Sequence, residues 1–174
     1  MQGFKRLLAA LAVSSAIAWL GSAPALASNN PHDRQPQPLP GPFTQPMCGP
    51  AIGDVTISID PSSFRATTMT FTLENGTTKI EFTGFARQIV QGNGKTLELN
   101  VSGPGALFIP LDGAPVLVAE GHLFYIGPVG TPQQGLFMYT GLTTLGLIDV
   151  APYGTIAVVT GFTGHKTDVC ALLA

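Results

Sequence analysis

Apolar and polar residues alternate along many short segments of the chain after residue 54, a pattern typical of β-strands with one buried face. The first two such segments are Asp54–Asp60 and Thr68–Glu74. Later segments of this kind are Leu97–Ser102, Leu107–Leu111, Val116–Ile126, Leu136–Thr140, Leu142–Val150 and Thr155–Phe162. Gly- and Pro-rich turns separate nearly all of them. The pattern predicts an all-β fold: a single antiparallel β-barrel, or alternatively a β-sandwich, of about eight to ten short strands.

The dipeptide Asn75-Gly76 lies between two alternating segments and predicts a β-hairpin with a two-residue turn. In this register Phe71 lies opposite Ile80, and Met69 lies opposite Phe82. Apolar residues then face apolar residues across the two strands, which supports the pairing.

The second strand of this hairpin changes its apolar parity around Gly84, which predicts a bulge or bend there. The next turn is Gly92-Asn93-Gly94. A three-residue loop opposes Arg87 to Leu99 and places the arginine on the apolar face, whereas a two-residue turn opposes Gln88 to Leu99. We adopt the three-residue loop, so Arg87 is expected on the buried side.

Glu120 and His122 lie two residues apart in a predicted strand, which places both side chains on one face. Together with Arg87 they form a candidate polar cluster at the barrel mouth that would bind a ligand or carry out acid–base chemistry. In the alternative arrangement the opposite face points inward and the cluster is solvated. That face carries Leu117, Ala119, Leu123 and Tyr125. This alternative is the commoner outcome for a strand with apolar residues on both faces.

The composition of the chain argues mainly against certain classes of function. Charged residues make up 10% of the chain, against about 25% in an average soluble protein. Eight Lys and Arg against ten Asp and Glu provide no basic face for phosphates, which argues against a nucleic-acid partner. Sequence signatures of zinc sites, phosphate-binding loops and nucleophilic serines are absent, so we predict no metal, cofactor or catalytic residue. His165 and Asp168 are interpreted as part of a polar turn and cap.

Residues 1–27 have the three parts of a secretory signal peptide: a basic start, the apolar run Leu7–Leu20 and the small-residue site Ala25-Leu26-Ala27. The run would span about 21 Å as a helix, less than the roughly 30 Å of a bilayer core, so we expect cleavage and no stable membrane anchor. Residues 28–47 are rich in proline and are predicted to be a disordered linker. Residues 48–174 are the predicted β-barrel domain.

The two cysteines of the chain, Cys48 and Cys170, bracket this predicted domain. In an oxidising extracellular or cell-envelope compartment an even number of cysteines predicts a disulfide. A bridge that closes so long a loop is expected to stabilise the fold by about 4 to 5 kcal/mol.

The C-terminal segment Thr167-Asp168-Val169-Cys170-Ala171-Leu172, together with the signal peptide and the Gly/Thr-rich β domain, resembles small secreted β-rich proteins of actinobacteria. This resemblance implies secretion and a β fold, and no particular activity. In strand number alone the predicted domain is similar to calycin barrels and to dirigent or allene-oxide-cyclase-type barrels, without the motifs of those families.

These observations favour a secreted β-barrel that is not an enzyme and binds a small apolar ligand in its interior or mouth, because a barrel of about eight strands can hold one small ligand. One alternative is a structural or interaction protein of the cell envelope with a filled core. A second alternative is a barrel enzyme of isomerase or cyclase type that uses Arg87, Glu120 and His122.

Overall fold

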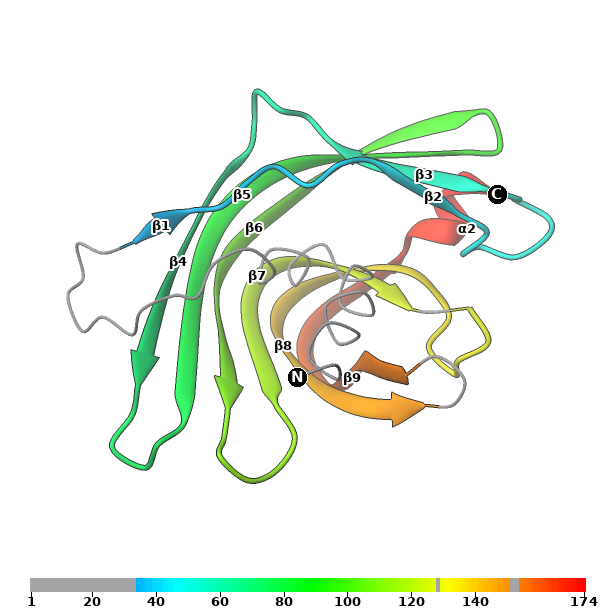
Figure 1. The fold of residues 1–174 in the computed structure, drawn as a ribbon. Coiled ribbons are helices and arrows are strands. Elements are labelled where there is room, and N and C mark those ends of the chain that lie inside the picture. Colours follow the sequence, from blue (N-terminus) through cyan, green and yellow to red (C-terminus); the bar gives the residue numbers. More distant parts are fainter. Residues whose placement is uncertain (1–33, 128, 151–153) are drawn as a thin grey trace.

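The computed structural model describes residues 34–127, 129–150 and 154–174 of the 174-residue chain, and the side chains of 149, 150, 154 and 155 are not considered. The predicted signal peptide lies outside these residues. The described part forms one antiparallel nine-stranded sheet and one short helix (Figure 1). The elements are β1 (Gln35–Pro36), β2 (Phe43–Gln45), β3 (Val55–Ile59), β4 (Arg65–Thr72), β5 (Thr78–Gly92), β6 (Lys95–Ile109), β7 (Val116–Gly127), β8 (Gly135–Val150), β9 (Gly154–Asp168) and α2 (Val169–Leu173).

The predicted all-β antiparallel fold is confirmed, and the expectation that its strands are short is wrong for β5 to β9. The sheet order is β1-β4-β5-β6-β7-β8-β9, and β3 pairs with both β2 and β5. Strands β5 to β9 contain 12 to 16 residues each. The Gly103-Pro104-Gly105 segment, expected to be a turn, lies inside β6, because its residues stay extended and keep their pairing with β5.

The hairpin of β4 and β5 forms at the predicted place, but its predicted register is wrong by one residue. Phe71 lies opposite Lys79 instead of Ile80. The N–H of Leu73 donates to the carbonyl of Thr77 (2.9 Å), so the loop has three residues. Gly76 closes it with φ +79°, the left-handed conformation that a three-residue hairpin loop requires.

The loop between β5 and β6 is the two-residue turn Asn93-Gly94, so the three-residue alternative is wrong. Both residues have positive φ, 51° and 73°, as a type I′ turn demands. Gln88 therefore faces Leu99, and Arg87 faces Asn100. The β5 register runs without a shift through Gly84, so of the bulge or bend predicted there, the bulge is wrong.

Five glycines, which we call the glycine row, lie on the neighbouring strands β5 to β9. They are Gly84, Gly103, Gly121, Gly141 and Gly164. Gly84 is paired with Gly103, Gly121 is paired with Gly141, and Gly141 is also paired with Gly164. A Cβ atom at any of the five would lie within 2.7 Å of a backbone oxygen. The backbones approach this closely because the side chains are missing, and the sheet curls strongly through β7, β8 and β9 (Figure 1).

Side-chain hydrogen bonds, rather than strand pairing, connect β9 at the end of this curl to β7 at its beginning. The hydroxyl of Tyr125 on β7 lies within donating distance of two acceptors, the carbonyl oxygen of Ala157 on β9 (2.9 Å) and Oε1 of Gln133 (3.0 Å), which share its one proton. The Gln133 amide exchanges two 2.8 Å hydrogen bonds with the backbone of Val159. Burial raises the pKa of Tyr125, which keeps this hydroxyl protonated as a donor. Within the described residues no backbone ladder joins β9 to β1, so the sheet is an open curl.

Two hydrophobic cores occupy the two sides of the curl. The first contains Leu117, Leu123, Tyr125, Tyr139, Leu145 and Leu147, together with neighbouring apolar side chains. The second contains Met47, Val55, Val90, Phe124, Leu136 and Leu173, with other residues of β3, β6 and α2. The predicted Cys48–Cys170 disulfide is confirmed and joins α2 to the segment before β3 across 122 residues.

Both ends of the predicted domain differ in detail from the sequence-based expectation. The described part of the predicted linker contributes β1 and β2, which pair with β4 and β3, so the sheet begins before residue 48. His165 and Asp168 lie in β9 and not in a turn, since the strand continues to α2. The cap was predicted correctly: the Asp168 carboxylate accepts a hydrogen bond from the Ala171 N–H (3.1 Å).

Candidate ligand cavity

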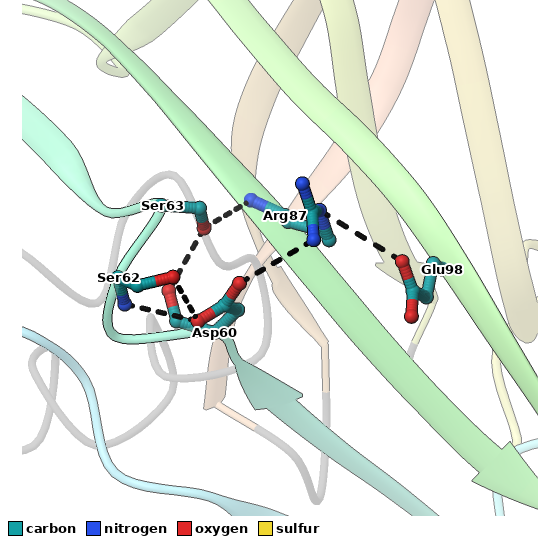
Figure 2. A network of polar contacts seen from close by, with 5 residues as sticks. All are labelled: Asp60, Ser62, Ser63, Arg87 and Glu98. Atoms are coloured by element: carbon teal, nitrogen blue, oxygen red, sulfur yellow. Dashed lines mark hydrogen bonds and ion pairs between the residues drawn. The ribbon is translucent and has the colours of Figure 1, made fainter.

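In the observed register of β5 and β6, Arg87 lies on the exposed face of β5 and not on the apolar face. Its side chain is 51% exposed, and its guanidinium lies 3.6 Å from the Asp60 carboxylate and 3.8 Å from that of Glu98 (Figure 2). Within the described residues Arg87 forms no hydrogen bond or ion pair with Glu120 or His122. The expectation that Arg87 faces the apolar side is therefore wrong.

Arg87 instead anchors the loop that joins β3 to β4. Its N–H donates to the Ser63 hydroxyl (2.8 Å), and its carbonyl accepts from the Asp60 N–H (2.9 Å; Figure 2). Oδ1 of Asp60 accepts hydrogen bonds from the hydroxyl (2.8 Å) and the N–H (2.9 Å) of Ser62. These two bonds, with the charge of Arg87 as a smaller cause, lower the pKa of Asp60. The contacts hold a loop, and they leave Arg87 no part in an interior site.

Glu120 and His122 share the face of β7 that the strand period predicts, beside the even-numbered side chains of β6. Glu120 is exposed and His122 is half-buried. Nδ1 of His122 lies 3.4 Å from the Ser102 hydroxyl, and no ion pair joins the histidine to Glu120 within the described residues. The arrangement contains no hydrogen-bonded Ser-His-carboxylate triad.

The opposite face of β7 lies in the first core, as the alternative arrangement expected. Leu117, Ala119, Leu123 and Tyr125 are each at most 6% exposed. Further along the strand, beyond Gly121, residues of both faces are buried because the two cores lie on either side of the sheet. This two-sided burial explains why the apolar pattern of β7 did not reveal which face points inward.

A partly open cavity of about 70 Å³ lies between β3, β5, β6 and β7, beside the glycine row. Most of its lining is apolar. It includes Ile59, Phe82, Phe85, Ala86, Val101 and Leu123. Glu120, His122 and Ser102 contribute to the same cavity, so the structure brings two of the three predicted site residues to it. Gly84 and Gly103 also line it.

Gln88, which our sequence-based interpretation did not select, is the buried polar residue of this cavity. It is 1% exposed, and its Oε1 atom has no hydrogen-bond partner in the described protein. Its position is fixed because β5 is paired on both sides there, with Ile59 of β3 and Leu99 of β6. Continuing the alternation from Ile80 and Phe82 without a break at Gly84 would have placed Gln88 inside.

A second hollow of about 430 Å³ lies along β1, β4 and β5 and is a more open groove. Phe64, Arg65 and Phe85 are among its lining residues. The smaller cavity is the more enclosed of the two and contains two of the predicted site residues, and we therefore treat it as the candidate site.

Comparisons with known proteins do not assign this site. Neither the protein-family models, nor the curated proteins, nor the solved structures match the chain. Within the part of the chain that the structure describes, no group of three or more His, Cys, Asp and Glu side chains is placed to hold a metal ion. None of the helices found in the same residues has the length and apolar character needed to cross a membrane.

Proposed function

We propose that this chain is a secreted, non-enzymatic protein that binds a small, mainly apolar ligand in the cavity beside Gln88. The curled sheet that carries the cavity would be the open form of the predicted barrel. The single observation that carries the proposal is the mainly apolar cavity between β3, β5, β6 and β7. Ligand sites are typically apolar hollows with few polar groups that fix the orientation of the ligand.

The volume of the cavity limits the size of this ligand. One water needs about 10 to 15 Å³ on the same scale, so about 70 Å³ corresponds to a few waters or one small organic molecule. Lipid-sized ligands need several hundred Å³. An apolar cavity that binds benzene has about 150 Å³, so the proposal is restricted to molecules of a few atoms, or to a ring that stays partly outside this open cavity.

The site is tested by titrating the folded, disulfide-bonded protein with xenon and with toluene and following backbone amide shifts by NMR. We expect saturable shifts around Ala86 and Leu123. Ala86→Val adds two methyl groups to the lining and is expected to weaken binding at least tenfold. Ala106→Val is the matched control, because Ala106 lies on β6 outside the lining of the cavity. If neither probe shifts these amides, or if both variants bind as the unmodified protein does, the proposal is wrong.

A structural or interaction role in the cell envelope is the second candidate. Two filled cores favour it, because they leave little interior space apart from the small cavity. Its distinguishing observation is the partly exposed aromatic cluster on β8 and β9. Phe162 is 47% exposed and lies 5.1 Å from the Tyr139 ring, and the Lys166 ammonium lies 3.8 Å from the Phe137 ring centre. A protein of this class would retain its function when Ala86→Val fills the cavity.

A further inference from the structure

We propose that the groove along β1, β4 and β5 is a second ligand site, which binds a small molecule with an apolar ring and one carboxylate. We call this groove the outer groove. The inference goes beyond the proposed function, because it concerns a different hollow and a charged class of ligand. Residues that line the outer groove include Pro36, Gln37, Phe64, Arg65, Thr67 and Phe85.

The size of the outer groove suits a small organic molecule. Its volume is about 430 Å³, within the range of about 300 to 1,000 Å³ that is usual for small-molecule sites. Much of its lining is apolar, with Pro36, Phe64, Ala66 and Phe85 among the residues that form it. A ring with a short chain therefore fits the groove and can leave water on this apolar surface.

The wall of the groove that β1 forms is held in place by several hydrogen bonds (Figure 1). Pro36 is paired with Thr67 of β4. The N–H of Gln37 donates to the carbonyl oxygen of Ala66 (2.9 Å), and the Gln37 amide nitrogen donates to the Thr68 hydroxyl (2.7 Å). The groove therefore exists before a ligand binds, and little ordering is needed on binding.

Arg65 and Phe85 lie on the same face of the sheet, because they are direct cross-strand partners in the antiparallel pair of β4 and β5. Phe85 is 40% exposed, an unusually open position for a phenylalanine, and Arg65 is exposed. A ring packed on Phe85 thus has a guanidinium within reach of a short chain. This pairing provides an apolar contact and a positive charge at one place.

The guanidinium of Arg65 has donors to spare. One N–H donates to the carbonyl oxygen of Phe64 (2.6 Å), out of the five that an arginine carries. Within the described residues no carboxylate lies close enough to form an ion pair with it, whereas Arg34 and Arg87 each have an acidic partner. A ligand carboxylate would supply the missing partner. A phosphate, with up to two negative charges, would be matched by one arginine only.

The charged groups on either side of the groove largely cancel one another. On one side Glu81 pairs with Lys79 and Arg34, which leaves one positive charge. On the other side Arg87 lies between Asp60 and Glu98, which leaves one negative charge (Figure 2). The charge of Arg65 therefore remains uncompensated at the groove, and it favours an anion over a cation.

The test compares three probes with the same ring and chain length at pH 7: 3-phenylpropionate, 3-phenyl-1-propanol and 3-phenylpropylamine. Dissociation constants are measured by NMR titration of the disulfide-bonded protein. The backbone amide of Thr67 reports on the outer groove and that of Leu123 on the smaller cavity, because each residue lines one hollow and not the other.

We expect the carboxylate to bind about 2- to 5-fold more tightly than the alcohol, the range of one exposed ion pair, and the ammonium to bind more weakly than the alcohol. The preference for the carboxylate should shrink as sodium chloride rises from about 20 to about 500 mM, because salt screens an exposed pair. This comparison uses the unmodified protein alone.

Arg65→Gln should abolish the preference for the carboxylate and leave the affinity for the alcohol within twofold. The residue is exposed, so the variant is expected to fold, which circular dichroism verifies. Arg34→Gln is the matched control: it removes the same charge, but Arg34 lies outside the lining and is already paired with Glu81. Arg34→Gln should therefore keep the preference.

Several results overturn the inference without affecting the proposed function. They are equal binding of the alcohol and the carboxylate, tighter binding of the ammonium, an unchanged preference in Arg65→Gln, and an absence of Thr67 shifts with every probe. Thr67 shifts that follow protein concentration instead of the probe would place a second copy in the groove and also overturn it.

The two sites can fail separately. Ala86 lines the smaller cavity and not the outer groove, so Ala86→Val should weaken toluene and leave 3-phenylpropionate unchanged. Arg65→Gln should have the opposite effects. Loss of 3-phenylpropionate binding in Ala86→Val would show that the probe occupies the smaller cavity, and the outer groove would then not be its site.

Discussion

Replacing Gly164 by alanine should test whether the glycine row is what allows the sheet to curl. Gly164 lies on β9 with φ +127° and is paired to Gly141 on β8. A Cβ atom there would lie 2.0 Å from the carbonyl oxygen of Thr140, well inside ordinary van der Waals contact. Alanine at this position therefore faces both an unfavourable backbone conformation and a clash with the neighbouring strand.

The expected loss of stability follows from these two effects. A non-glycine residue in such a sparsely populated region of φ costs about 1 to 3 kcal/mol. Relieving the clash requires β8 and β9 to separate by about 1 Å, and losing one or two ladder hydrogen bonds costs about 1 kcal/mol each. The sum is about 2 to 5 kcal/mol. At about 3 to 4 °C per kcal/mol for a domain of this size, the melting temperature should fall by roughly 6 to 20 °C.

Gly161 provides a matched control on the same strand. A Cβ atom there would have no heavy atom within 4 Å, and its φ is not positive. Gly161→Ala should leave the melting temperature unchanged or raise it slightly, because alanine costs less backbone entropy in a strand than glycine does. The assay is thermal and urea unfolding of both variants, followed by far-ultraviolet circular dichroism with the disulfide intact. Melting temperatures that agree within about 2 °C would refute the role given to the glycine row.

Three further outcomes are expected from the contacts described above. Removing the bridge with Cys48→Ser and Cys170→Ser together should lower the free energy of unfolding by about 4 to 5 kcal/mol, and an unchanged melting temperature after reduction would contradict this. Tyr125→Phe should cost about 1 to 2 kcal/mol, because it removes a buried hydroxyl donor. Tyr139→Phe should cost almost nothing in the same urea titration, since no described residue hydrogen-bonds its hydroxyl. Finally, folding lowers the pKa of Asp60, so its carboxylate stabilises the fold above about pH 4 and this contribution disappears as the pH falls through the folded-state pKa. The stability difference between the unmodified protein and Asp60→Asn should therefore shrink between pH 6 and pH 2, and a constant difference would show that these hydrogen bonds do not depend on the charge.

Alternation of apolar and polar residues was sufficient to predict the fold class, because a period of two indicates strands wherever one face is buried. The disulfide could also be predicted from the sequence, since two cysteines allow one intramolecular pairing. The lengths of the strands could not be predicted from the sequence, because Gly and Pro residues ordinarily indicate turns. In β6 the residues Gly103 and Gly105 remain extended and paired, so the expected turn is a bend inside a strand.

The predicted site depended on strand register, where an error of one residue moves every side chain to the other face. Asn-Gly dipeptides fit both two-residue and three-residue hairpin loops, and local sequence does not decide between them. On β5 the apolar residues Phe85 and Ile89 lie on the outer face beside Arg87, and they suggested a change of parity that does not occur. The consequence was the choice of Arg87 in place of its neighbour Gln88.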